Sequence, residues 1–209
     1  QYIPVAAADT TSYPEVRDAS GTIIVKPASD YYEIGLVEFY EKMHSGLAPT
    51  LQRGYVQLAT TTVPGAGIPL SYLDGSPICY PGTLPAACTA GSASQVKAVD
   101  NPHFLGPTIV GTSNKPIRVK FYNLLPVGPK DRQTNRRPGD LFLPVDETVM
   151  GSGYGPAVPG VAGETFTQNR AAVHLHGNNT VWISDGTPHQ WITPANETTA
   201  YPQGVSVRS

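Results

Sequence analysis

Alternating hydrophobic and polar residues predict one clear β-strand at residues 115–123. Ile117, Val119 and Phe121 would point to one face of this strand, and the two basic residues between them would point to the other. Successive side chains of a strand face opposite ways, so the pattern is typical of a strand that buries one face. Short runs rich in β-branched and aromatic residues predict further strands at residues 22–26, 31–40, 54–58, 108–110 and 171–176.

Turn-forming residues separate these runs. The chain has 21 glycines and 21 prolines among 209 residues, and both residue types break helices. Helical periodicity is scarce, although residues 31–44 could also be read as part of a helix. We therefore exclude a helical bundle and predict an all-β sandwich or barrel. Residues 128–140 and 151–163 are expected to be long loops, and the basic residues of the first are interpreted as solvated side chains rather than as an anion site.

The organisation along the chain suggests an extended N-terminal segment followed by a compact domain. We place the N-terminal arm at residues 1–50, where it would pack on the domain, and the domain itself at residues 51–209. No repeat of fixed period is visible.

The charge balance narrows the classes of partner. Fourteen Lys and Arg residues stand against 16 Asp and Glu residues, which gives a formal net charge of -2. A nucleic-acid-binding protein needs a concentrated basic surface, so we expect no nucleic-acid partner. No apolar run approaches the roughly 18 residues of a membrane span, so we expect no membrane association.

Several features favour a secreted protein. The chain starts at Gln1 without an initiator Met or a leader pattern, which is expected of a mature or trimmed product. Cys79 and Cys88 bracket a loop rich in turn formers and long enough to close a disulfide, with two free thiols as the alternative. Neither cysteine has the neighbours of a metal site. Asn178 and Asn196 begin N-glycosylation sequons.

The chemistry-bearing motif is a pair of histidines, His174 and His176. On a strand their imidazoles would project to one side about 7 Å apart, given the rise of ~3.3 Å per residue, while Val173 and Leu175 would anchor the other face in the core. Such a pair suits one divalent ion or two neighbouring ions, and Gly177 would let the backbone turn. The alternative is two ordinary histidines near the end of a strand. A cupin site is disfavoured because no Glu follows at the expected spacing.

The neighbourhood of this motif resembles a known family. His-Leu-His-Gly at 174–177, followed by Ser-Asp-Gly-x-Pro-x-Gln-Trp at 184–191, is similar to the first copper-binding segment of multicopper oxidases. The resemblance is to the branch that contains spore-coat laccases, bilirubin oxidases and phenoxazinone synthases. Residues 31–55, Gly-Pro-Thr-Ile at 106–109 and Val-x-Phe-x-Asn-Leu-Leu-Pro at 119–126 also resemble segments of that branch, in the same order.

The resemblance implies a cupredoxin-like Greek-key β-sandwich and specific roles. It implies that His174 binds the type 2 copper and His176 a type 3 copper of a trinuclear centre, where O2 is reduced to water. Asp185 would assist proton delivery, since a carboxylate can accept and release a proton beside a bound water; the alternative is a plain turn residue. Trp182 and Trp191 are interpreted as packing residues. Three other histidines, His44, His103 and His189, are interpreted as structural or exposed.

The chain also departs from the family pattern. A trinuclear centre needs four HxH motifs, and electron entry needs a type 1 copper with a cysteine ligand, whereas this chain has one HxH motif and no suitable cysteine. We therefore predict an N-terminal chain or fragment of a secreted multicopper oxidase. A second chain or segment would supply the other ligands and the site for a phenolic or related substrate. The alternatives are a non-catalytic cupredoxin-like copper-binding or assembly module and a zinc hydrolase that uses the HxH pair.

Overall fold

The protein is built almost entirely of β-strands and loops. The structure, a computed structural model, describes residues 3–25, 28–149, 152–153, 166–177 and 190–198. Within these ranges the helical structure is one short 3-10 turn, η1 at Pro85–Ala87, and no helix there is long and apolar enough to cross a membrane. The prediction of an all-β fold is confirmed, and the several sheets are consistent with a cupredoxin-like sandwich.

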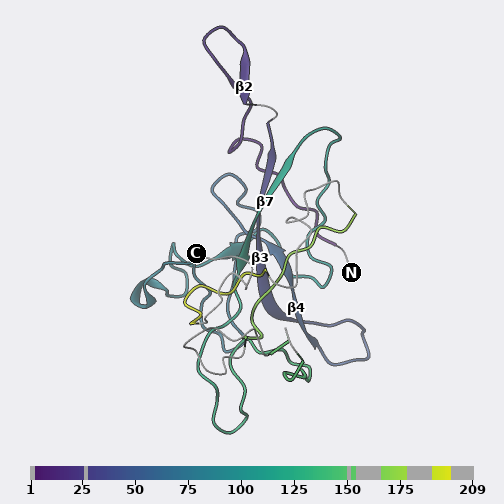
Figure 1. Cartoon of the computed structure of the whole chain (residues 1–209), viewed down its shortest axis with the longest axis vertical. Helices are drawn as coiled ribbons and strands as arrows, with labels where there is room; N and C mark the ends of the chain where they lie inside the picture. Colours follow the sequence, from purple (N-terminus) through teal and green to yellow (C-terminus); the bar gives the residue numbers. More distant parts are fainter. Residues whose placement is uncertain (1–2, 26–27, 150–151, 154–165, 178–189, 199–209) are drawn as a thin grey trace. The chain divides into compact units, whose positions relative to one another are not determined.

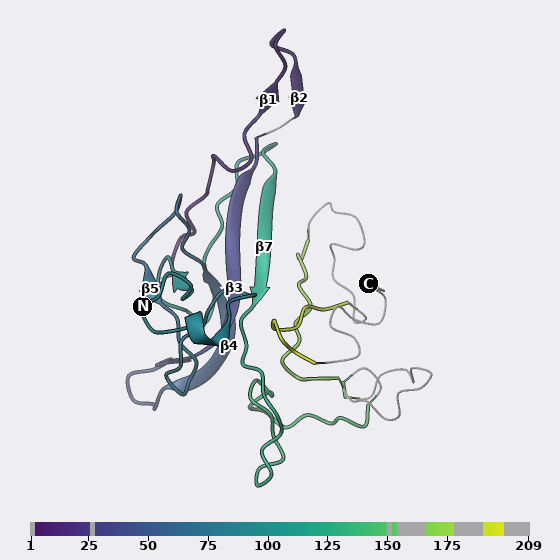
Figure 2. The ribbon, with the colours of Figure 1, turned by 90° about the vertical axis from the view of Figure 1, so that its left-hand side faces the viewer.

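The chain divides into two compact units, Gln1–Tyr122 and Asn123–Ser209. The main sheet has the strand order β4-β3-β7, and Figures 1 and 2 show β3 running between its two neighbours. The strands span Asp30–Glu41 for β3, Thr50–Gln57 for β4 and Ile117–Asn123 for β7.

Strand β3 resolves the ambiguity at residues 31–44 in favour of a strand. It pairs with β4 in antiparallel register from Ile34 opposite Gln57 to Glu41 opposite Thr50. Four consecutive residues in its middle are buried, which means that both faces of the strand are covered. A strand covered on both faces loses the alternation that marks a half-exposed strand, and this explains why its sequence pattern was ambiguous.

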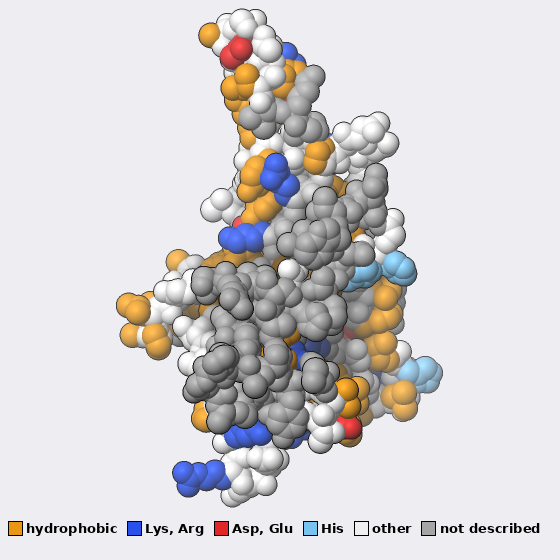
Figure 3. Space-filling model, viewed as in Figure 1, with side chains coloured by type: hydrophobic (Ala, Val, Ile, Leu, Met, Phe, Trp, Pro, Cys, Tyr) orange, Lys and Arg blue, Asp and Glu red, His pale blue; other side chains and the backbone are white. Residues whose placement is uncertain are grey.

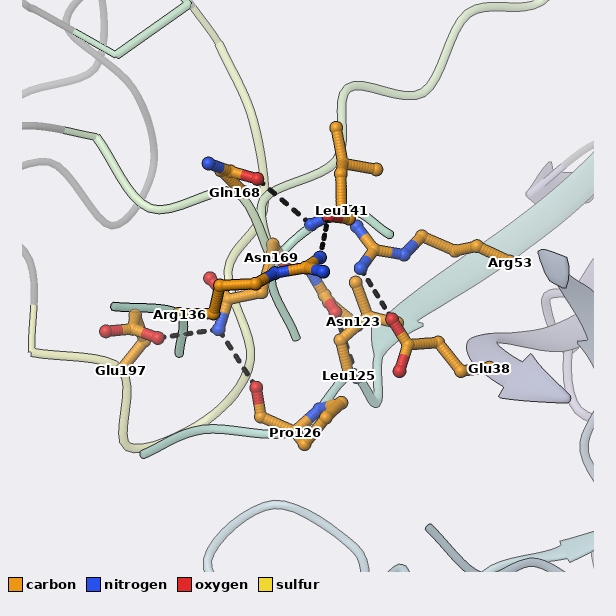
Figure 4. Close-up of polar contacts among 10 residues, drawn as sticks. All are labelled: Glu38, Arg53, Asn123, Leu125, Pro126, Arg136, Leu141, Gln168, Asn169 and Glu197. Atoms are coloured by element: carbon orange, nitrogen blue, oxygen red, sulfur yellow. Dashed lines mark hydrogen bonds and ion pairs between the residues drawn. The ribbon is translucent and has the colours of Figure 1, made fainter. Parts of the chain in front are cut away.

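A buried ion pair fixes the register of β3 against β4. Glu38 and Arg53 lie opposite each other in the ladder, and Arg53 Nη2 donates to Glu38 Oε1 at 2.6 Å (Figure 4). The two side chains are only 9% and 12% exposed. Removing one partner of such a buried pair typically costs roughly 3–5 kcal/mol, because the remaining charge is left without compensation.

Two small sheets complete the described strands. A hairpin joins β1 at Val16–Arg17 to β2 at Ile23–Val25; hydrophobic and charged side chains mix on its surface in Figure 3. Strand β5 at Ile68–Pro69 pairs with β6 at Lys97–Ala98. The strands predicted at residues 22–26, 54–58 and 115–123 therefore correspond to β2, part of β4 and β7.

Two strand predictions were wrong. Residues 108–110 form only an isolated bridge between Thr108 and Val5, and residues 171–176 form only an isolated bridge between Ala171 and Ile192. Both segments have β-branched or apolar residues, but a strand also needs a neighbour over several residues, and each finds one at a single position.

The hydrophobic core of the first unit lies around the main sheet and the β5–β6 pair. Its buried side chains are Tyr32, Ile34, Leu36, Val37, Val56, Leu58, Leu70, Ile78, Val96 and Ala98. The N-terminal segment is held against this sheet. Ala7 exchanges two hydrogen bonds with the side-chain amide of Gln57, at 2.9 and 2.6 Å, and Asp9 pairs with Tyr31 through two backbone hydrogen bonds. The predicted boundary between an arm and a domain near residue 50 stays a prediction.

The predicted disulfide is present. Cys79 and Cys88 are bonded, with their Cα atoms 5.8 Å apart and a sequence separation of nine, so the alternative of two free thiols is wrong. The bond closes the loop that contains η1, and Cys79 also pairs with Gln95 in an isolated bridge.

Replacing both Cys79 and Cys88 by Ser should lower the free energy of unfolding by about 2–3 kcal/mol. The bond restricts a loop of about ten residues in the unfolded chain, and loops of that size give this range of stabilisation. Urea unfolding followed by circular dichroism would measure the difference. The unreduced wild-type chain should also resist alkylation by iodoacetamide; rapid alkylation without reductant would contradict the bond.

Hydrogen bonds to the Asp9 carboxylate should make the free energy of unfolding fall at low pH. The Ser12 hydroxyl and the Thr11 backbone N–H donate to its carboxylate, and these hydrogen bonds hold the pKa of Asp9 at about 2, below its ordinary value of 3.8. Because the pKa is lower in the folded state, the stabilisation is complete above pH 4 and is lost as the pH falls toward 2.

We therefore expect Asp9→Asn to be less stable than wild type by about 1–2 kcal/mol at pH 7, with the difference shrinking as the pH falls from 4 to 2. Urea unfolding at a series of pH values would show this. Asp74→Asn is the comparison variant: hydrogen bonds from Ser76 also lower the pKa of Asp74, but this carboxylate lies in an exposed turn, so its loss should change the stability less. A constant difference between wild type and Asp9→Asn over this pH range would contradict the assignment.

Candidate metal site

Asn123, the last residue of β7, organises the second unit. Its side-chain Nδ2 donates to two backbone carbonyls, Asn169 O at 2.7 Å and Ile192 O at 2.9 Å. Its Oδ1 accepts from Leu125 N at 3.1 Å. One buried amide therefore ties the end of a strand to two segments that are distant in the sequence, and all of its bonds are made inside the protein.

A second set of buried polar contacts extends from Asn169. Its Nδ2 donates to Pro126 O at 3.1 Å and to Glu197 Oε2 at 2.6 Å (Figure 4). The other carboxylate oxygen of Glu197 accepts from Arg137 Nη2 at 2.6 Å, and the Glu197 side chain is completely buried. Gly139 lies against this cluster, where a Cβ would come within 2.5 Å of Pro126 O. Glycine is needed there for space as well as for its φ of 78°.

The segment that leads to the histidines is anchored at Arg170 and Ala171. Ala171 and Ile192 exchange two backbone hydrogen bonds at 2.9 and 2.8 Å. The Arg170 guanidinium lies over two aromatic rings, with its Cζ 4.8 Å from the ring centroids of both Phe166 and Trp191. These rings contact each other edge to face at 4.8 Å. Trp191 is 7% exposed, which agrees with its interpretation as a packing residue.

The two candidate ligands lie side by side. The imidazole centroids of His174 and His176 are 5.7 Å apart, and both residues are exposed. The expectation that the two rings project together agrees with this distance. The expectation that Val173 and Leu175 lie in the core was wrong for Leu175, which is 51% exposed, whereas Val173 is half-buried. Within the part of the chain that the structure describes, residues 172–175 pair with no strand that would hold an alternating pattern.

The sequence also singles out residues other than this pair. Asp185 and Asn178 lie outside the described residues, as do Trp182 and His189, and their roles stay predictions. Asn196 is exposed in a turn with a φ of 69°; its glycosylation also stays a prediction. His44 Nδ1 accepts from Gly46 N at 3.0 Å. His103 Nε2 lies 3.1 Å from Glu41 Oε1, and both contacts agree with structural roles.

The donor set suits copper but is incomplete. Neutral imidazole is a good ligand for copper, and two adjacent exposed rings could each offer a nitrogen lone pair to one ion or to neighbouring ions. Within the described part of the chain, no group of three or more His, Cys, Asp or Glu side chains is arranged to hold a metal ion. The two imidazoles are thus compatible with copper, but they are fewer ligands than a copper ion takes.

Sequence reasoning did not identify Asn123, Asn169, Glu197 or Arg170 as supports of this site. Asn123 was noticed only as part of a strand motif. Its partners lie 46 and 69 residues away, and no local pattern reveals such pairings. Glu197 lies inside a glycosylation sequon, which drew attention to the neighbouring Asn196 instead.

Comparison with known proteins gives a partial match. No family model matches the chain. A laccase of Bacillus stratosphericus is 27% identical to it over 192 residues, which are 91% of this chain and 24% of the laccase. The chain thus spans about a quarter of the length of this relative. This similarity supports a relationship between the chain and a part of a copper-dependent oxidoreductase of the multicopper oxidase type.

Proposed function

We propose that this chain is the N-terminal part of a secreted multicopper oxidase and contributes His174 and His176 to its trinuclear copper centre. The observation that carries the proposal is the pair of exposed imidazoles 5.7 Å apart, in the segment whose motif resembles a copper-binding segment. The similarity to a laccase over most of the chain supports the same function.

The chain's own contribution would be to hold two imidazoles in a fixed relation. His174 would bind the type 2 copper and His176 a type 3 copper, each through a neutral ring nitrogen. The bound copper would supply the electron transfer that reduces O2 to water while a phenolic or related substrate is oxidised. Asp185 would hydrogen-bond water near the centre and pass on its proton.

The oxidase would be complete only with further polypeptide. Two imidazoles do not saturate a copper ion, and the matched part of the laccase is 24% of its length. We propose that a further chain or segment carries the remaining HxH motifs, the cysteine ligand of the type 1 copper and the site for the reducing substrate. The alternative is a non-catalytic copper-binding or assembly module, which would present the same two exposed imidazoles without further ligands.

His174→Ala and His176→Ala should each weaken Cu(II) binding by the full-length chain at least about tenfold, because each removes one of two neighbouring ligands. Isothermal titration calorimetry would give the affinity, and electron paramagnetic resonance would show nitrogen coordination in the wild type. His44→Ala is the control, since that imidazole is engaged in a local turn. Unchanged Cu(II) affinity in the double variant of His174 and His176 would contradict the proposal.

Native mass spectrometry of the protein from its own source separates the oxidase from the stand-alone module. If the chain is part of an oxidase, we expect it to be detected in a complex with copper and with a polypeptide that has further HxH motifs. A chain that carries copper without any such polypeptide would favour the module instead.

A further inference from the structure

We propose that Arg170 is a positioning residue for His174 and His176: its guanidinium, which lies over the rings of Phe166 and Trp191, fixes the start of the segment that carries the two imidazoles. The proposal rests on the proposed function, because it names what holds the copper ligands in place. It adds a role to a residue that lies four positions before the first histidine.

The contacts of Arg170 make it a rigid anchor. Its Cζ is 4.8 Å from both aromatic centroids, within the range of about 6 Å in which a cation is attracted to a ring face. Its Nη2 donates to Ser152 O at 2.9 Å. Phe166 and Trp191 are only 6% and 7% exposed, so the cation contacts rings that are themselves fixed in the interior.

The segment that carries the histidines buries little of its apolar surface. Leu175 between the two histidines is 51% exposed, and Val173 is only half-buried. Residues 172–175 pair with no strand within the described part of the chain. The segment is attached just before the imidazoles, where Arg170 contacts the rings of Phe166 and Trp191 and Ala171 bonds to Ile192.

Two neighbouring contacts join the segment at residues 170–171 to the segment at residues 191–192. Trp191 is adjacent to Ile192, so the guanidinium contact and the Ala171–Ile192 bridge connect neighbouring residues on both sides. Burial lowers the pKa of Arg170 below its ordinary value, which shows that the cation has given up part of its hydration for these contacts. An aliphatic side chain would fill the space, but it would not bind two ring faces and a carbonyl at once.

The test compares Arg170→Met, which removes the charge, with Arg118→Met as the matched control. The Arg118 Cζ also lies 4.8 Å from an aromatic centroid, that of Tyr13, in the other unit of the chain. In the full-length chain, we expect Arg170→Met to weaken Cu(II) binding roughly tenfold or more, as is typical when a group that orients metal ligands is lost, and to change the Cu(II) electron paramagnetic resonance spectrum. Arg118→Met should change neither.

Metal-free nuclear magnetic resonance provides a second readout. Arg170→Met should shift the ring-proton resonances of His174 and His176 and leave those of His44 in place, and Arg170→Lys, which keeps a cation, should restore part of the wild-type spectrum. If Arg170→Met does not fold, Phe166→Leu replaces it, because it removes one ring contact and keeps the charge.

The outcomes separate the two proposals. Unchanged histidine resonances together with unchanged Cu(II) affinity in the folded variants would overturn the positioning role. A copper-loaded native protein in which neither His174 nor His176 binds copper would overturn the proposed function, while the metal-free resonances would still decide the role of Arg170.

Discussion

The buried side-chain amide of Asn123 is the interaction on which the second unit depends. It satisfies two backbone carbonyls from segments distant in the sequence and one backbone N–H two residues along the chain. A buried carbonyl that loses its donor costs roughly 1–3 kcal/mol, so an apolar replacement would leave two such groups unpaired. The geometry of an amide, with donors on one side and an acceptor on the other, also fixes how the segments at Asn169 and Ile192 approach each other.

The contacts just before the histidines depend on how closely the segments at Asn169 and Ile192 approach each other. Once Asn169 and Ile192 are held by the same amide, Ala171 can bond to Ile192, and Arg170 can lie over the rings of Phe166 and Trp191. The buried ion pair of Glu197 and Arg137 closes the other side of the cluster. The support is thus interior and polar, whereas the two imidazoles it presents are exposed and open to further ligands, which suits a metal centre that is shared with other polypeptide segments.

The sequence predicted the features that depend on local pattern. The β7 strand was visible because its residues alternate, and the disulfide was predictable because a turn-rich loop brings Cys79 and Cys88 within bonding distance. The spacing of His174 and His176 was enough to expect adjacent rings. What the sequence could not reveal depends on distant partners. Residues 172–175 look like a strand but pair with no strand among the described residues, and Leu175 is exposed instead of buried.

Anomalous diffraction at the copper edge, from crystals of the copper-loaded native protein, would test the central claim most directly. The account predicts anomalous peaks within about 2 Å of a ring nitrogen of both His174 and His176, the usual length of a bond between imidazole and a metal. It also predicts that further ligands of these ions come from residues outside this chain. Copper bound elsewhere, with no anomalous peak beside either imidazole, would contradict it.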